Sequence, residues 1–146
     1  MAAEGAHVFA VARSPITADL VTPEGVAALA ALGEVDVLVN NLGGVIPESM
    51  GAAGFLAIDD DAWQRTYELN LFATVRVTRA LLPGLLARRG VVVTVSSIGA
   101  RAAFPPVDHG TAKAALNNLT KALSEEFAPS GLRALTVTPG PTRTAN

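Results

Sequence analysis

Four short apolar runs, separated by helical patterns, limit most strongly how this chain can fold. They occupy residues 6–12, 35–40, 91–96 and 132–138, and each is rich in valine, leucine or threonine. Most are nearly continuous in apolar residues instead of alternating with polar ones, which predicts parallel strands buried on both faces of a sheet. Strands that alternate with helices connect by right-handed crossovers, so the sequence predicts an α/β fold with an open sheet.

Three helical patterns lie between the predicted strands. The first covers 22–32, and the third covers 110–127 with an apolar stripe on one side. The second covers 59–89 and opens on three aspartates, whose charge suits the positive N-terminus of a helix. Pro83 and Gly84 are expected to kink or end this second helix, because proline lacks the backbone N–H and clashes with the preceding turn.

Two further segments of the chain are expected to lack regular structure. Residues 42–58 predict a long loop, and loops of that length in a compact domain often carry function. The segment from Ser14 to Asp19 is too short for a further strand. With 146 residues, the chain predicts a single domain spanning 1–146.

Composition excludes several classes of function. Half of the residues are hydrophobic and the net charge is −2, which argues against disorder and against a nucleic-acid partner. The chain has no cysteine and two histidines, so neither a disulfide framework nor a metal site is expected. No basic leader and no uncharged apolar run of about 18 residues is present, so we expect a soluble, cytoplasmic protein without a membrane span.

Small, hydroxyl, amide and glycine residues follow the predicted strands. The segments are Arg13–Ser14, 40–44, 96–100 and 138–144. Ligands of open parallel sheets bind outside the carboxyl ends of the strands, and glycine lets a ligand approach the backbone. A single such segment is explained equally well as an ordinary turn, but four at matching ends predict a nucleotide pocket.

Five motifs then give the chain a resemblance to a known family. They are NNLG (40–43), ELNLF (68–72), VSS (95–97), AKAALNNLTKALSEEF (112–127) and PGPTRT (139–144). In this order they resemble the short-chain dehydrogenases/reductases. The resemblance implies a Rossmann-like three-layer sandwich, with the chain as a single, partial dinucleotide-binding domain. It also implies NAD(P)(H)-dependent hydride transfer between an alcohol and a carbonyl.

The resemblance assigns cofactor contacts by position. Asp19 would contact the adenine, and Lys113 would bind the nicotinamide ribose. Arg13 would stand near the adenosine ribose and could hold a 2′-phosphate, which slightly favours NADP over NAD. The full set of cofactor-binding residues that it implies is Arg13, Asp19, Asn40, Asn41, Gly43, Lys113, Pro139, Gly140 and Thr144.

The catalytic residues implied by the resemblance are Asn70, Ser97, His109 and Lys113. Asn70 would hold a water of the proton relay. Ser97, or its neighbour Ser96, would hydrogen-bond the substrate oxygen. Lys113 would lower the pKa of the catalytic tyrosine, because a nearby ammonium favours the phenolate.

That tyrosine is not found where the family pattern, Tyr-x-x-x-Lys, would place it. The position four before Lys113 is His109. Either histidine has replaced the tyrosine, or one residue has been lost between His109 and Gly110. An imidazole of ordinary pKa, about 6.5, is a competent acid or base, but a misplaced acid/base costs about 10²–10⁴ in rate. We therefore expect weakened activity.

The sequence departs from the family pattern in other places as well. The family's first strand, its glycine-rich turn and its C-terminal lobe have no counterpart in this sequence. The chain is accordingly interpreted as a fragment of a longer protein or as a shortened member. The resemblance implies a homo-oligomer formed through 59–82 and 110–127. A second hypothesis is a catalytically silent binding or scaffold module that acts through this oligomer face.

Overall fold

A parallel sheet of three strands forms the centre of the molecule. The computed structural model describes residues 1–12 and 16–141. The sheet has the order β3 (Val37–Asn40), β4 (Val91–Val95), β5 (Arg133–Val137), and its register pairs Val37 with Val91 and Val91 with Arg133. The predicted parallel α/β arrangement is confirmed, with strands slightly shorter than the apolar runs.

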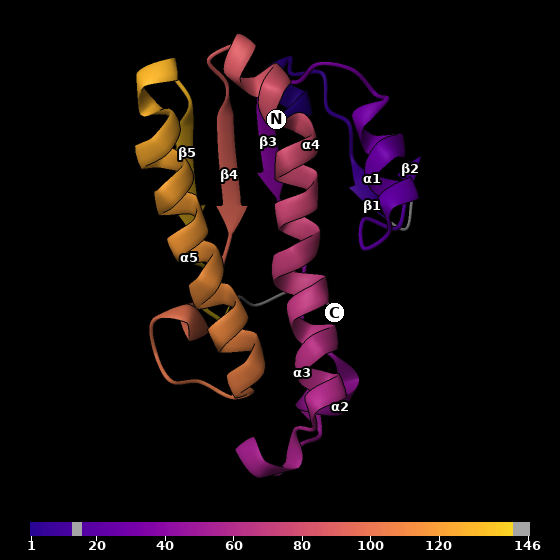
Figure 1. Ribbon diagram of the computed structural model, residues 1–146, viewed down its shortest axis with the longest axis vertical. Coiled ribbons are helices and arrows are strands. Elements are labelled where there is room, and N and C mark those ends of the chain that lie inside the picture. Colours follow the sequence, from indigo (N-terminus) through magenta and orange to yellow (C-terminus); the bar gives the residue numbers. More distant parts are fainter. Residues whose placement is uncertain (13–15, 142–146) are drawn as a thin grey trace.

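Two long helices cover one face of this sheet. Figure 1 shows α4 (Ala73–Ala87) and α5 (Val107–Phe127) side by side in front of the strands. The main core lies between these two layers and extends to the N-terminal part of the chain. Its buried members are Leu20, Val26, Leu38, Val77, Leu81, Leu85, Val92 and Leu132.

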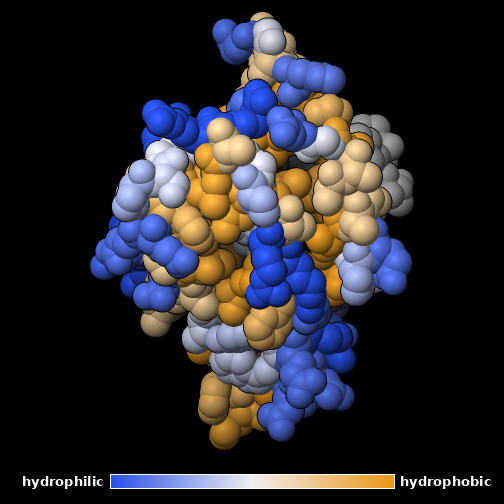
Figure 2. All heavy atoms as spheres, turned by 45° about the horizontal axis from the view of Figure 1, so that its top comes forward, coloured by the Kyte–Doolittle hydropathy of each residue, from blue (hydrophilic) through white to orange (hydrophobic). Residues whose placement is uncertain are grey.

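The other face of the sheet is open, which corrects the prediction of strands buried on both faces. Val37 and Val39 are 40% and 44% exposed, and Leu135 and Val137 are 51% and 47% exposed. Figure 2 shows apolar areas that reach the surface between hydrophilic side chains. The runs are apolar on both sides because parallel strands of this kind usually carry helices on both faces. In the part of the chain that the structure describes, one layer of helices packs on the sheet.

The N-terminal segment forms a second, two-stranded sheet. A short 3₁₀ helix, η1 (Ala2–Glu4), precedes β1 (Val11–Ala12), which pairs in parallel with β2 (Ile16–Thr17) as a two-stranded sheet. Two predictions are thereby corrected: the strand expected over 6–12 contains two residues, and the segment before Asp19 does form a strand. The helix expected over 22–32 is α1 (Pro23–Ala30), whose N-cap Thr22 accepts a hydrogen bond from the Gly25 N–H at 3.1 Å.

The helix expected over 59–89 has three parts. They are α3 (Asp60–Tyr67), a π-helical turn labelled η3 (Glu68–Phe72), and α4. Pro83 lies inside α4 and does not end it, because the flanking Leu81 and Leu85 are buried in the core and hold the helix on both sides of the proline.

Short helices occupy the connections. The loop predicted over 42–58 contains α2 (Pro47–Met50) and η2 (Phe55–Ala57). Helix α5 begins three residues before the predicted start at Gly110. The remaining 3₁₀ turns are η4 (Ile98–Ala100), after β4, and η5 (Ala128–Ser130), after α5.

One continuous helical run has the length and composition of a membrane span. Asp60–Ala87 reaches a mean hydropathy of 1.2 in its most apolar window. Val77, Leu81 and Leu85 of this run are buried against the sheet, and the core helix of a globular protein has the same composition. The expectation that the protein does not span a membrane stays a prediction.

Candidate functional site

The side chain of Lys113 joins α5 to the carboxyl ends of two strands. Its Nζ donates hydrogen bonds to the Leu42 and Val95 carbonyl oxygens, both at 3.1 Å. The side chain is 5% exposed, and this burial lowers its pKa. An ammonium group has three N–H donors, so these two bonds leave one donor for a further acceptor.

Gly43 and Asn70 pack against this lysine. Gly43 has a φ of +120°, and a Cβ built on it would lie 2.2 Å from Asn70 Oδ1 and 2.9 Å from Lys113 Nζ. Both the backbone angle and the space therefore require glycine. The structure brings together three of the residues singled out by sequence: Gly43, Asn70 and Lys113.

Asn70 holds the backbone beside Gly43. It is fully buried within the π-helical turn, and π turns in helices frequently occur at functional sites. Its Oδ1 accepts from the Gly44 N–H at 3.0 Å, while its Nδ2 donates to the Gly44 and Thr66 carbonyls at 3.0 and 2.9 Å. Both amide hydrogens are thus bonded within the protein, which makes Asn70 a support for the loop after β3.

The two serines after β4 have different partners. Ser96 is buried, and its hydroxyl donates to the Lys113 carbonyl at 3.1 Å. Ser97 is half-buried and accepts from the Gly99 N–H at 3.2 Å as the N-cap of η4. A hydroxyl that accepts one bond can still donate its own proton, so Ser97 is better placed than Ser96 to hydrogen-bond a ligand oxygen.

The segment after β5 lies against the same end of β4. The Ile98 N–H donates to the Pro139 carbonyl at 3.0 Å, next to Ser97. Gly140 follows and is exposed. Pro139 and Gly140 therefore lie near the residues at the carboxyl end of the sheet, as expected from the strand order. Thr144 lies outside the described residues.

His109 lies one helical turn before Lys113. Its ring is half-buried, and its pKa is lowered first by this burial and second by the Lys113 ammonium, while Asp108 acts in the opposite direction. Burial and the nearby ammonium therefore favour the neutral form of the ring. At neutral pH, His109 is therefore a neutral imidazole that can accept a proton.

We predict that an NMR titration of His109 gives a pKa below its ordinary value of 6.5. Because a nearby cation disfavours protonation, Lys113→Met should raise this pKa. A His109 pKa above 6.5, or one that Lys113→Met lowers, would contradict the burial and charge that the structure gives this ring.

Asp108 is a site residue that sequence analysis missed. It is fully buried, and its Oδ2 accepts from Ser49 Oγ at 2.5 Å and from Thr66 Oγ1 at 2.6 Å. Burial alone would raise its pKa, but these hydrogen bonds and those from backbone N–H groups lower it overall. Asp108 thus ties the first turn of α5, which carries His109, to α2 and α3. No sequence spacing pairs an acid with hydroxyls so far away in the chain.

The remaining predicted cofactor residues are hydrogen-bonded within the protein, are exposed, or lie outside the described residues. Asn40 is buried, and its Nδ2 donates to Thr78 Oγ1 at 2.9 Å, which joins β3 to α4. Asn41 is exposed. Asp19 is exposed in the turn before α1, where its Oδ1 accepts from the Val21 N–H at 3.1 Å. Arg13 lies outside the described residues.

Comparison with known proteins identifies the family of this chain. The sequence model of the short chain dehydrogenase family matches residues 15–146. This chain belongs to the short-chain dehydrogenase/reductase family. Its resemblance therefore extends well beyond the five motifs, and its three-stranded parallel sheet with helices is a Rossmann-like fold.

The relatives of this chain include proteins named as a dehydrogenase and as reductases. The chain is 32% identical to the 2-keto-3-deoxy-L-fuconate dehydrogenase of Xanthomonas campestris pv. campestris, covering 94% of this chain and 47% of that protein. It is 33% identical to the L-xylulose reductase of Homo sapiens, covering 94% of this chain and 62% of that protein. Among solved structures, a 3-oxoacyl-[acyl-carrier protein] reductase with bound NAD from Brucella melitensis superposes with a TM-score of 0.77. That match has 31% identity and covers 86% of this chain and 50% of the other.

The chain spans about half the length of the curated relatives it matches. The family uses NAD(P)(H), and the residues described above include the lysine, serine and glycine positions at one end of the sheet. What the whole protein acts on is therefore a matter for proposal.

Proposed function

We propose that this chain is a single, partial dinucleotide-binding domain of an NAD(P)(H)-dependent oxidoreductase that interconverts an alcohol and a carbonyl. Its activity is weakened because His109 occupies the position of the acid/base tyrosine. The observation that carries the proposal is the placement of the buried Lys113 ammonium. It lies between the carboxyl ends of β3 and β4, against Gly43, and one helical turn from His109.

The residues present fit a nicotinamide cofactor. Lys113 has one N–H left for a ribose hydroxyl, and Gly43 keeps the space beside that ammonium free of a side chain. The bound cofactor would accept or supply the hydride. Ser97 would donate a hydrogen bond to the substrate oxygen, which stabilises negative charge developing there.

His109 would act as the acid or base that transfers the proton of the substrate hydroxyl. In the direction of alcohol oxidation, the neutral ring accepts the proton that leaves the hydroxyl group. Because its pKa is lowered, the ring stays neutral to a lower pH than an ordinary histidine, and the rate should fall only when the pH drops below that lowered pKa. An imidazole is shorter than a phenol, so the transfer is expected to pass through a water, and to be slow.

The wider properties of the protein belong to the same proposal. We infer a soluble, cytoplasmic enzyme that acts on a small molecule and forms a homo-oligomer through α3, α4 and α5. NADP is favoured over NAD on the charge of Arg13. A weaker affinity for NADPH in Arg13→Ala, with an unchanged affinity for NADH, would support that preference.

Titration with NADPH, followed by cofactor fluorescence, tests the proposal directly. We expect Lys113→Ala to weaken binding at least about tenfold, since a hydrogen bond from a charged group contributes about 1.5–3 kcal/mol. The matched control is Lys121→Ala. This lysine lies on the same helix, but its side chain is 72% exposed and pairs with Glu125 on the surface. The control should bind NADPH like the unaltered protein.

The alternatives give different results in the same titration. Binding that is unaffected by Lys113→Ala would contradict the ribose contact. A folded protein that binds neither NADPH nor NADH would contradict the oxidoreductase proposal. That result, together with self-association, would instead support the catalytically silent scaffold module.

A further inference from the structure

A buried carboxylate lies directly before His109 in the first turn of α5. Asp108 is fully buried, and its Oδ2 accepts from Ser49 Oγ at 2.5 Å and from Thr66 Oγ1 at 2.6 Å. These distances are typical of a hydroxyl that donates to an ionised carboxylate, a bond stronger than one between neutral groups. Because Ser49 lies on α2 and Thr66 on α3, a single side chain fixes the start of α5 against two other helices.

The same carboxylate interacts with the backbone that carries His109. Burial opposes its ionisation, but the hydroxyls of Ser49 and Thr66, followed by the backbone N–H groups of His109 and Asp108, lower the pKa of Asp108 overall. The first N–H groups of a helix have no partner within the helix, so a negative charge in the first turn is stabilising there. The anchor therefore holds the backbone of His109 as well as the helix start.

The residue after His109 is packed as closely as the residue before it. A Cβ built on Gly110 would lie 2.8 Å from the Gly99 carbonyl oxygen of η4, so a residue without a side chain lets α5 approach η4 at this point. Ser97 is the N-cap of η4. Asp108 on one side and Gly110 on the other thus fix the backbone of His109 beside the turn that begins at Ser97.

The hydrogen bonds of Asp108 continue to the surroundings of Lys113. Thr66 donates its hydroxyl to Asp108, while its carbonyl accepts from Asn70 Nδ2 at 2.9 Å. Asn70 supports the loop after β3, which packs against Lys113. One network of buried polar groups therefore links the residue before His109 to the loop that contacts Lys113, one helical turn further along α5.

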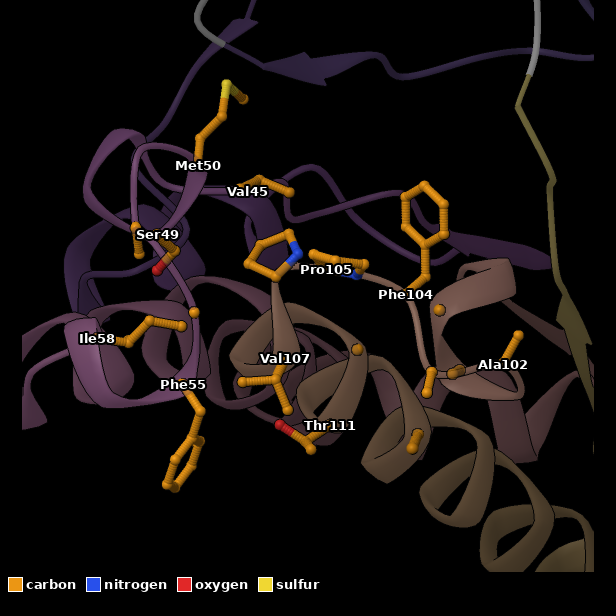
Figure 3. Close-up of a pocket in the computed structure, with 18 of the residues that line it drawn as sticks. Val45, Ser49, Met50, Phe55, Ile58, Ala102, Phe104, Pro105, Val107 and Thr111 are labelled. Atoms are coloured by element: carbon orange, nitrogen blue, oxygen red, sulfur yellow. The ribbon is translucent and has the colours of Figure 1, made fainter.

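This network borders an apolar pocket with a volume of about 800 Å³. Figure 3 shows Ser49 on the α2 side of the pocket, and Val107 and Thr111 on the side of α5. Asp108 is fully buried and is not among the lining residues. Its carboxylate therefore acts through the residues that it holds, and not by touching a molecule in the pocket.

Stability alone is a weak explanation for a charge at this position. Removing a carboxylate from water is costly, and replacing a buried charged group by apolar side chains of similar volume is often neutral or stabilising. The other use of such a group is to specify one arrangement of its neighbours. At Asp108 the nearest neighbour with chemistry of its own is His109.

We propose that Asp108 is a positioning residue, whose anchored carboxylate holds the His109 ring in one orientation for proton transfer. The inference rests on the function proposed above, in which His109 is the acid/base. Asp108 itself exchanges no proton with the substrate in this scheme. Its effect is on the orientation and the charge environment of the ring.

The orientation of the His109 ring can be measured without turnover, from the three-bond NMR couplings that report its χ1 rotamer. We expect one rotamer in the unaltered protein and averaging over several in Asp108→Ala. Asp108→Asn should restore the single rotamer, because an amide oxygen can still accept from both hydroxyls. A single, unchanged rotamer in folded Asp108→Ala would overturn the proposal.

Asp108→Asn also separates the charge from the anchor. Burial and the Lys113 ammonium lower the pKa of His109, whereas the Asp108 carboxylate raises it. Removing this negative charge while the anchor is kept should therefore lower the pKa of His109 further, and the fall in oxidation rate at low pH should move to lower pH with it. A His109 pKa that stays the same or rises would contradict the influence of Asp108 on the ring.

Steady-state kinetics provide a second readout. Asp108→Ala should lower kcat for alcohol oxidation about tenfold to a hundredfold, the cost of a displaced reacting group, while KM and NADPH affinity stay within about twofold. Thr66→Val removes one of the two hydroxyls and should lower kcat by a smaller factor. The matched control is Thr120→Val, because Thr120 is also buried but its hydroxyl donates to the Leu116 carbonyl of its own helix. The control should leave kcat and the His109 rotamer unchanged.

The results separate this proposal from the proposed function. Circular dichroism establishes that each variant is folded, and Thr66→Val provides the test if Asp108→Ala does not fold. Equal losses of kcat in Thr66→Val and Thr120→Val would overturn a specific role of Asp108. If the chain oxidises no alcohol, the proposed function fails, while the rotamer measurement still decides whether Asp108 holds the ring of His109.

Discussion

His109→Tyr should raise the rate of alcohol oxidation by about 10²–10⁴-fold, the usual contribution of a placed general acid/base. The phenol of tyrosine extends further than imidazole from the same position on α5. The buried Lys113 ammonium one turn away favours the phenolate, which lowers the ordinary pKa of about 10 toward neutrality. The measurement is NADP reduction with a panel of alcohols, and NADPH oxidation with the matching ketones.

His109→Phe is the matched control for this gain. It supplies an aromatic ring of similar reach without a hydroxyl, so it should be no more active than the unaltered protein. NADPH affinity should be similar in all three proteins, which separates proton transfer from cofactor binding. An unchanged rate in His109→Tyr, with intact cofactor binding, would show that position 109 does not face the reacting atoms.

Gly43→Ala is expected to lower the free energy of unfolding by about 3 kcal/mol, the sum of backbone strain and overpacking of a buried contact. The φ of +120° is unfavourable for alanine, and the new methyl group would lie 2.2 Å from Asn70 Oδ1. Relief requires moving Asn70 or Lys113, so cofactor affinity should fall as well. Urea unfolding, followed by circular dichroism, measures the loss.

Gly44→Ala is a close control for this substitution. An added Cβ at Gly44 meets nothing within 4 Å, and its backbone lies outside the left-handed region. We expect a change within about 0.5 kcal/mol, as for an ordinary surface substitution. If Gly43→Ala and Gly44→Ala lower the free energy of unfolding equally, then the tight packing of Gly43 against Asn70 and Lys113 is not what requires glycine at this position.

The sequence predicted the strands and helices better than it predicted the contacts between them. Four apolar runs identified β1, β3, β4 and β5, since each run appears in the structure as a shorter strand. Pro83 was expected to kink or end its helix. It does not end α4, because the buried Leu81 and Leu85 stabilise the helix across the proline, and the kink stays a prediction.

Several features of the site could not be predicted from spacing. Asp108 meets Ser49 and Thr66, which lie 59 and 42 residues away in the chain. Ser96 and Ser97 are neighbours with the same chemistry, and only their hydrogen bonds distinguish them. Long-range contacts of this kind depend on how helices pack on the sheet, and a single sequence carries no periodic signal for them.

By itself, the sequence determined the α/β class, the family motifs and the histidine that precedes Lys113 by one turn, because periodicity and spacing along the chain are local properties. The tertiary structure alone decided that one face of the sheet is open, that Lys113 is buried against Gly43, and that an apolar pocket lies beside α5. The physical reason is that burial and contact arise from packing between distant segments, which no local pattern records.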